Sequence, residues 1–233
     1  MLTSNVIKNL ATNLGADLCG IAPIDRFENA PKGFHPRDVY KNTKSVISIA
    51  CRIPDGPLNA DNIIPYSAIE EMVLSKINGI TLALSLAIED KGSKAVIIPS
   101  TPYDYWDEEN MEGRGILSLK HLAYFAGLGY MGQNTLLCNP EYGNLIKLGA
   151  ILTDTELEAD EMLKGEMCEV NCNLCVDSCP VGAIENNRVI QKICRPHSEI
   201  KNKRGVEIYA CNICRKVCPN RNGIEVGSLN NYI

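Results

Sequence analysis

The fold of the C-terminal third is decided by one stretch, CEVNCNLCVDSCP (residues 168–180), which places four cysteines before a proline. The bacterial iron–sulfur run reads Cys-x2-Cys-x2-Cys-x3-Cys-Pro. Cys168 stands one residue early against that run, which would place its first cysteine at Glu169. The stretch therefore predicts iron–sulfur ligation with a one-residue insertion in the loop before the helix.

The pattern repeats further along the chain. The run from Cys172 to Pro180 recurs 39 residues later, from Cys211 to Pro219. In two-cluster ferredoxins the cysteine before proline ligates the other cluster, so each site needs one ligand from outside the repeats. Cys168 and Cys194 are the remaining cysteines in this part. We assign Cys168, Cys172, Cys175 and Cys218 to one 4Fe-4S cluster, and Cys179, Cys194, Cys211 and Cys214 to a second.

Other sites built on cysteine fit less well. Zinc ribbons present two Cys-x2-Cys pairs, whereas here a third cysteine follows each pair and precedes proline. A thioredoxin-like reading lacks the βαβ context. Cys19, Cys51 and Cys138 lie in apolar runs and are expected to be small buried hydrophobes.

Composition predicts a cytoplasmic protein without a membrane segment. The first residues carry no leader pattern, and no run reaches the roughly 20 apolar residues of a membrane span. Eight of the eleven cysteines lie in the last third, which favours metal ligation over disulfides. The net charge is −5, yet residues 188–221 are basic. Three interpretations of the basic run are open: it binds nucleic acid, it offsets the negative charge of the clusters, or it docks an acidic electron donor.

Helical and strand patterns mix without strict alternation, which predicts an α+β fold. We expect helices at residues 5–15, 68–88 and 117–125, strands at 16–22, 45–51 and 94–99, an irregular segment at 104–114, and a hairpin of strands 135–138 and 145–153. The domain boundary is expected at the acidic stretch, giving a domain of residues 1–165 and a cysteine module of residues 166–233.

A glycine-rich motif, GLGYMG (residues 127–132), formally matches Gly-x-Gly-x-x-Gly. The dinucleotide fingerprint needs a strand before the glycines and a helix after them, and here the order is reversed. We reject a Rossmann site. The glycines still indicate close backbone approach, either to a packed helix or to a flat cofactor.

The segment AGLGYMGQNTLL (126–137), with NPEYG (139–143) and LGAILTD (148–154), resembles the epoxyqueuosine reductases and their relatives, the reductive dehalogenases. The resemblance implies a nitroreductase-like α/β sandwich domain that holds base-off cobalamin, followed by a ferredoxin-like domain with two 4Fe-4S clusters that pass electrons to cobalt. A flavin in the same cavity is the alternative. The implied cofactor-binding residues are Gly127, Gly129, Tyr130, Gly132, Gln133, Asn134 and Thr135.

The sequence differs from that family in three features, which change the substrate and the proton donor that we expect. Epoxyqueuosine reductases continue into a helical-repeat region that holds tRNA, whereas this sequence ends fifteen residues after Cys218. We therefore expect a small organic substrate and no tRNA. The family's aspartate proton donor is not matched in residues 110–115, and Gln133 replaces a usual lysine.

A reduction that leaves negative charge on its product needs a proton donor within hydrogen-bond reach. The candidates are Tyr103, Tyr105, Glu112 and His121. Each has a structural alternative: the tyrosines can cap the core beside Trp106, the glutamate can belong to a solvated acidic loop, and the histidine can be a satisfied core residue.

Two functions are compatible with these patterns. One is a reductase fed by a protein such as ferredoxin or flavodoxin. The other is an electron carrier that docks a partner and performs no substrate chemistry. The retained glycine loop and the large first domain favour the reductase; the loss of the aspartate and the lysine favours the carrier.

Overall fold

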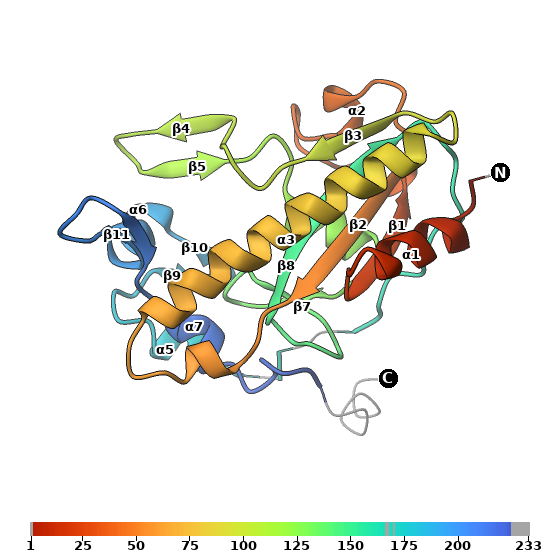
Figure 1. Cartoon of the computed structure of the whole chain (residues 1–233). Coiled ribbons are helices and arrows are strands. Elements are labelled where there is room, and N and C mark those ends of the chain that lie inside the picture. The colour runs from red at the N-terminus through yellow and green to blue at the C-terminus, as the bar shows by residue number, and fades with distance from the viewer. Residues whose placement is uncertain (1, 166–167, 170, 225–233) are drawn as a thin grey trace.

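The computed structural model describes residues 2–165, 168–169 and 171–224. Its centre is an antiparallel four-stranded sheet in the order β1-β2-β8-β3 (Figure 1). These strands are β1 (Leu18–Pro23), β2 (Ser45–Arg52), β8 (Ile146–Thr153) and β3 (Ala95–Ile98). The mixture of helix and sheet confirms the predicted α+β class.

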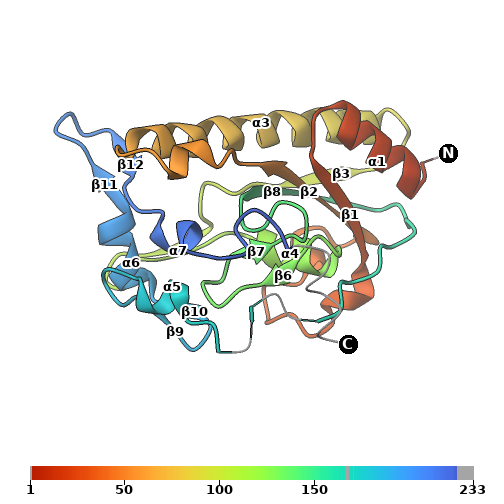
Figure 2. The same cartoon turned by 90° about the horizontal axis from the view of Figure 1, so that it is seen from below.

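One face of the sheet is covered by α3 (Ile64–Glu89), with α1 (Ser4–Asn13) beside it (Figure 2). Ile77 and Leu84 of α3 are buried in the same core as Ile49 and Ile151 of the two central strands. A Cβ at Gly149 would lie 3.2 Å from Ile77 Cγ1, so glycine there lets the helix approach β8 closely. This packing fixes α3 against the sheet.

Within the described residues, α3 is the one helix long and apolar enough to cross a membrane, which the sequence expectation missed. That property follows from length and composition alone, and the core helix of a soluble protein shares it. The buried residues of α3 between Val73 and Ile88 pack against the sheet, so α3 is a core helix of this fold.

The opposite face carries α4 (Leu119–Phe125). Leu122 and Ala126 pack with Val46 and Leu152 of the central strands. Residues 2–165 also contain three short helices: η1 (Ile24–Phe27), α2 (Pro36–Val39) and η2 (Gly56–Leu58).

Two local predictions were wrong. The segment 135–138 does not pair with 145–153: β7 (Leu137–Cys138) pairs with β6 (Tyr130–Met131), while β8 lies between β2 and β3. The physical reason is that β8 is apolar almost throughout. A strand of this kind buries its side chains on both faces when it lies in the middle of a covered sheet. The segment 104–114 is not wholly irregular, because β4 (Tyr105–Asp107) and β5 (Glu112–Arg114) form a hairpin.

The cysteine module consists of short elements. They are α5 (Leu174–Asp177), β9 (Ile184–Glu185), β10 (Arg188–Val189), α6 (Gln191–Ser198), β11 (Glu199–Lys201), β12 (Glu207–Tyr209) and α7 (Ile213–Lys216). The last nine residues of the predicted module, 225–233, lie outside the described residues.

A buried ionic cluster joins the module to α3. Glu70 is 3% exposed and pairs with Lys147 of β8 and, at 3.8 Å, with Arg215 of α7. Arg215 also donates to the carbonyl of Asn144. Burial raises the pKa of Glu70, but the two cations outweigh it, so the net pKa is lowered. The carboxylate therefore stays charged and holds α7 against the first domain.

Candidate functional site

A cavity of about 1310 Å³ lies between the β6–β7 loop and the cysteine module. Ordinary small-molecule pockets have volumes of about 300–1,000 Å³, so this cavity can take a large cofactor. The wall formed by residues before 165 includes an aromatic and apolar patch, with Tyr124, Phe125, Tyr130 and Met131. Its other wall includes α6 and the turns around Cys179 and Cys211.

Five of the seven predicted cofactor residues line this cavity. They are Tyr130, Gly132, Gln133, Asn134 and Thr135. The loop is a tight turn: the amide of Thr135 donates to the carbonyl of Gly132 at 2.8 Å, and the amide of Gly132 donates to the carbonyl of Leu136 at 2.9 Å. Asn134 is buried and donates from Nδ2 to the carbonyl of Cys214 at 2.9 Å. The loop is thus held directly against the second repeat.

Gly127 and Gly129 are not among the residues that line the cavity, so their contact with a cofactor stays a prediction. A Cβ at Gly127 would lie 2.3 Å from the carbonyl oxygen of Glu161, and a Cβ at Gly129 would lie 2.4 Å from that of Cys138. The close approach that the sequence indicates is, at these two positions, to the protein's own backbone.

The cysteines assigned to the first cluster gather around a second, small pocket. Cys168, Cys172, Cys175 and Cys218 all line it, so the last cysteine of the second repeat lies with the first repeat. Gly132, Gln133 and Asn134 line both this pocket and the large cavity. The cofactor loop is therefore the wall between the two spaces.

The cysteines assigned to the second cluster line the large cavity. They are Cys179, Cys194, Cys211 and Cys214. The crossing of Cys179 and Cys218 follows from the packing of α5 against α7, since each short helix ends beside the other repeat. Among residues 2–165, 168–169 and 171–224, no three His, Cys, Asp or Glu side chains converge on one metal position.

A fifth thiol, missed from the sequence, lines the small pocket. Cys138 at the end of β7 is 2% exposed and lies beside Cys218. The hydrogen bond between the two side chains, together with burial, raises the pKa of Cys138. The same hydrogen bond lowers the pKa of Cys218 to about 7. In sequence Cys138 ends an apolar run, and that pattern alone gives no sign of a second thiol nearby.

The proton-donor candidates separate into two groups. Tyr103, Glu112 and His121 line the cavity, whereas Tyr105 does not. Tyr105 is exposed and carries the guanidinium of Arg114 over its ring at 4.7 Å. The role of Tyr105 as a proton donor therefore stays a prediction, and the residue has no place in the cavity lining.

His121 is held in a defined orientation. Its Nδ1 lies 2.7 Å from the hydroxyl of Ser118. Burial, and then the neighbouring charge of Lys120, lower the pKa of His121. The imidazole is therefore neutral near pH 7 and presents one N–H donor.

Lys120 is a cavity residue that the sequence pattern did not single out. Its ammonium donates to the carbonyl of Thr135 at 3.2 Å, and burial lowers its pKa. The spacing of α4 places it next to His121, but nothing in that spacing distinguishes it from a surface lysine.

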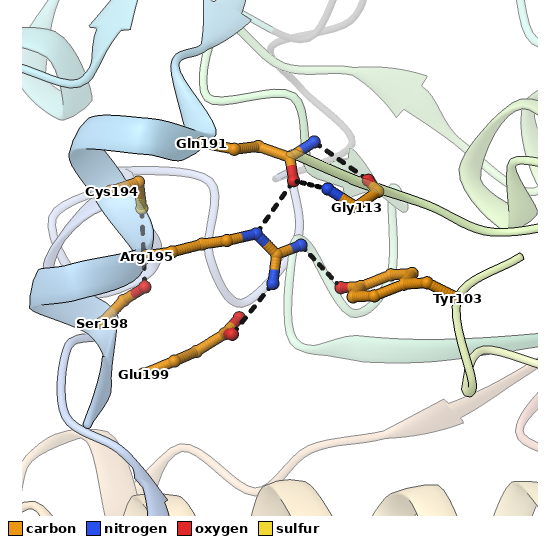
Figure 3. A network of polar contacts seen from close by, with 7 residues as sticks. All are labelled: Tyr103, Gly113, Gln191, Cys194, Arg195, Ser198 and Glu199. Atoms are coloured by element: carbon orange, nitrogen blue, oxygen red, sulfur yellow. Dashed lines mark hydrogen bonds and ion pairs between the residues drawn. The ribbon is translucent and has the colours of Figure 1, made fainter. Parts of the chain in front are cut away.

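Arg195 of α6 lines the cavity and takes part in a network of polar contacts that reaches Tyr103 (Figure 3). Its guanidinium donates to Tyr103 Oη at 2.8 Å, Gln191 Oε1 at 2.9 Å and Glu199 Oε2 at 2.9 Å. Gln191 in turn exchanges two hydrogen bonds with the backbone of Gly113. The helix that carries Cys194 is thereby fixed to the segment that carries Tyr103.

Comparison with known proteins confirms the resemblance inferred from the motifs. No family model matches the chain. An epoxyqueuosine reductase from Bacillus anthracis is 28% identical over 91% of this chain and 63% of its own length. One from Leadbetterella byssophila is 26% identical over 93% of this chain and 79% of its own length. The chain thus spans less than two thirds of the first of these relatives.

Solved structures share the fold. An epoxyqueuosine reductase from Streptococcus thermophilus matches 97% of this chain and 68% of its own with a TM-score of 0.67 at 20% identity. A catabolic reductive dehalogenase matches 97% of this chain and 33% of its own with a TM-score of 0.69 at 19% identity. At these identities the likeness establishes the fold and leaves the chemistry to the residues.

One comparison overturns the expectation that tRNA is not a partner. An epoxyqueuosine reductase solved with an epoxyqueuosine-modified tRNA stem loop matches 95% of this chain and 66% of its own, with a TM-score of 0.66 at 20% identity. The region that this chain shares with it therefore occurs in a protein that holds tRNA. Sequence length and negative net charge were insufficient grounds to exclude that substrate.

Proposed function

We propose that the chain is an iron–sulfur reductase of the epoxyqueuosine reductase type, in which two 4Fe-4S clusters supply electrons to a cofactor in the large cavity. One observation carries this proposal: the predicted cofactor loop and the cysteines of both repeats line adjoining spaces that share the wall Gly132 to Asn134. A carrier without substrate chemistry has no use for a cavity of this size beside its clusters.

The thiol arrangement fits two clusters. The four cysteines assigned to the first cluster line the small pocket, and the four assigned to the second line the large cavity, which Cys168 of the first set also borders. Cys179 and Cys218 cross between the repeats, as expected of two-cluster ferredoxins. The charge of Arg215 acts on Cys214, and that of Arg221 acts on Cys218, so both arginines offset the negative charge of thiolate-ligated clusters. In the first domain, the remaining cysteines Cys19 and Cys51 lie apart in the main core.

The cavity fits a corrinoid bound without a histidine ligand. Gly132 lines the cavity, and the aromatic side chains of the wall offer a flat apolar contact for a macrocycle. None of the three histidines, His35, His121 and His197, stands in an Asp-x-His-x-x-Gly setting. Cobalamin, when bound, would supply a strongly reducing metal centre; flavin is the alternative occupant of the same cavity.

The chain's own contribution would be orientation and protonation. Neutral His121 lines the cavity and can place a proton near a reduced substrate. Glu112 also lines the cavity, as a carboxylate 3.1 Å from Arg114 Nε, and would have to take up a proton before it could donate one. Tyr103 is a third donor, with its hydroxyl fixed by Arg195. These groups stand in for the family's aspartate, which this sequence lacks.

The substrate proposed is an epoxyqueuosine-bearing tRNA, or a fragment of it. The support is the solved relative with a modified tRNA stem loop, together with the basic run in residues 188–221 that partly borders the cavity. A location in the cytoplasm belongs to the same proposal.

The test uses anaerobically purified full-length protein. Cobalamin is added and the absorbance spectrum is recorded; base-off binding is expected, and Gly132→Val should weaken it, because the added Cβ lies 3.0 Å from Asn134 Oδ1 and disturbs the loop that lines the cavity. Gly56→Val, where nothing lies within 4 Å of the added Cβ, is the control for a bulky side chain in place of glycine. Reduced protein is then given the modified tRNA stem loop, and conversion is followed by mass spectrometry of the nucleoside.

Each outcome has a defined meaning. Base-off cobalamin with conversion supports the whole proposal. Bound flavin with conversion replaces the cofactor and keeps the reductase. Intact clusters with no bound cofactor and no conversion favour the electron carrier.

A further inference from the structure

A strained residue follows the wall between the two pockets. Thr135, in the turn of residues 132–136, has a φ of 61°, which lies in the left-handed region. A β-branched side chain is rarely found there, and such a conformation persists only where the surrounding contacts determine it. The contacts of this turn therefore decide the shape of the wall.

Hydrogen bonds tie the turn to two other parts of the chain. Lys120 donates from Nζ to the carbonyl of Thr135 at 3.2 Å, and Asn134 donates from Nδ2 to the carbonyl of Cys214 at 2.9 Å. The lysine contact is made at the end of a flexible stem, whereas Asn134 has a short side chain and is 4% exposed. Asn134 is thus the rigid link between the turn and the second repeat.

The side-chain amide of Asn134 uses both of its ends. Its Oδ1 accepts from the backbone N–H of Leu136 at 3.1 Å, inside the turn. Because Leu136 offers a donor and the Cys214 carbonyl is an acceptor, the orientation of the amide is fixed. One side chain therefore both closes the turn and joins it to α7.

The carbonyl that Asn134 reaches belongs to a very short helix. α7 has four residues, so its carbonyls need partners from outside the helix. Asn144 supplies another such partner, since its Nδ2 donates to the carbonyl of Arg215 at 3.2 Å. Both asparagines come from the part of the chain before residue 165, and that part therefore completes the helix that carries Cys214.

We propose that Asn134 is a positioning residue that couples the cofactor cavity to the second cluster. Its hydrogen bond to the Cys214 carbonyl holds the turn in its strained form while the second repeat is in place. The inference rests on the proposed function, which assigns Cys214 to that cluster. A helix of four residues is not stable alone, so loss of the cluster releases α7 and loosens the turn. A loosened turn in its own right weakens cofactor binding, because coupling between two sites is reciprocal.

The test compares Asn134→Asp with wild type in the full-length, anaerobically purified protein. Aspartate keeps an oxygen acceptor for Leu136 and removes the donor to Cys214. The matched control is Asn78→Asp, at an exposed position of α3. Hydrogen exchange of residues 130–137 is measured by mass spectrometry, with β2 as the internal reference. Cobalamin affinity is measured by absorbance titration, and iron content is determined for each protein.

Asn134→Asp should speed the exchange of residues 130–137 by about two- to tenfold, the effect of one ordinary hydrogen bond, and leave β2 unchanged. Cobalamin affinity should fall by a similar factor, and Asn78→Asp should change neither quantity. Cys211→Ser, which removes a ligand of the second cluster, should also speed exchange of the turn. Combined with Asn134→Asp it should add nothing further, because both changes break the same link.

Unchanged exchange of residues 130–137 in Asn134→Asp would overturn the proposal, as would equal increases in the turn and in β2, which indicate general destabilisation. Additive effects of Asn134→Asp and Cys211→Ser would also overturn it. If Asn134→Asp does not fold, Asn134→Ser carries the comparison, since its hydroxyl can accept from Leu136 and is too short to reach Cys214. Absence of clusters in the wild-type protein would contradict the proposed function, whereas exchange in Asn134→Asp would still decide whether Asn134 holds the turn.

Discussion

Arg195 and Tyr103 are joined by a hydrogen bond of 2.8 Å, and the guanidinium also lies over the tyrosine ring at 4.8 Å from its centroid. The contact links α6, which carries Cys194, to the segment that leads into the β4–β5 hairpin. Trp106 adds a second ring at 5.2 Å from the same guanidinium. One side chain therefore fixes a cavity wall across the boundary between the cysteine module and the first domain.

Replacing Arg195 with lysine should loosen that wall. Lysine keeps the charge but loses the planar fork that reaches Tyr103, Gln191 and Glu199 together. Hydrogen exchange of residues 103–114 should become faster by about tenfold or more, since a charge-assisted hydrogen bond contributes about 1.5–3 kcal/mol. Arg204→Lys, at an exposed turn, is the control and should leave that exchange unchanged. If hydrogen exchange of residues 103–114 is equally slow in both variants, Arg195 does not bridge α6 and this segment.

Glu70→Gln should destabilise the folded protein. It leaves Lys147 and Arg215 without their buried counter-charge, and breaking such a pair costs about 3–5 kcal/mol. The measurement is the free energy of unfolding in denaturant, and the exposed neighbour substitution Glu71→Gln is the control. If Glu70→Gln lowers the free energy of unfolding by no more than Glu71→Gln does, this ionic cluster does not hold α7 in place.

The two ion pairs of Glu70 also predict how the stability of the protein varies with pH. Because the folded pKa of Glu70 is lowered, the unfolded chain binds more protons in acid. The contribution is therefore present above the ordinary glutamate pKa and is lost as the pH falls through the folded value. The difference in unfolding free energy between wild type and Glu70→Gln should shrink in that acidic window. A difference that stays constant from neutral pH to acid contradicts this assignment.

His121 should titrate below the ordinary histidine range. Burial is the main cause and the charge of Lys120 the second, so Lys120→Met should raise the pKa of His121 without fully restoring it. NMR of the imidazole signals, assigned through His121→Gln, measures both values. An unchanged pKa in Lys120→Met would show that the two side chains are not coupled in the cavity.

Glycine substitutions should separate packing from cofactor contact. Gly129→Ala forces a Cβ to within 2.4 Å of the Cys138 carbonyl and is expected to lower the melting temperature strongly. Gly79→Ala on α3 meets nothing within 4 Å and should stabilise by about 0.5–1 kcal/mol, because alanine favours helix. Equal melting temperatures for Gly129→Ala and wild type would contradict the close approach.

The helices and central strands were predictable because each carries a local pattern. The long helix has its apolar stripe at helical spacing, and the runs around Val46 and Ile151 are continuously apolar. The predicted hairpin failed because the Pro140–Gly143 turn is a local signal, whereas the partner of β8 is chosen by burial from distant strands.

The site was predictable where spacing encodes it and unpredictable where the fold creates it. The spacing of the repeat, together with the crossing rule of two-cluster ferredoxins, predicts that Cys218 belongs to the first set, and these cysteines line one pocket. The proximity of Cys138 to that set, the half-buried position of Lys120 and the bridge made by Arg195 depend on contacts between segments far apart in the chain. No residue pattern along the sequence reports such contacts.

The most direct test of the account is the metal content of the anaerobically purified protein. Two 4Fe-4S clusters require about eight iron atoms and about eight acid-labile sulfides per chain, with the EPR signals of reduced clusters. Cys168→Ser should lower that content, whereas Glu169→Ala should not. About four irons per chain, or zinc in stoichiometric amount, would contradict the two-cluster assignment on which the proposed reductase depends.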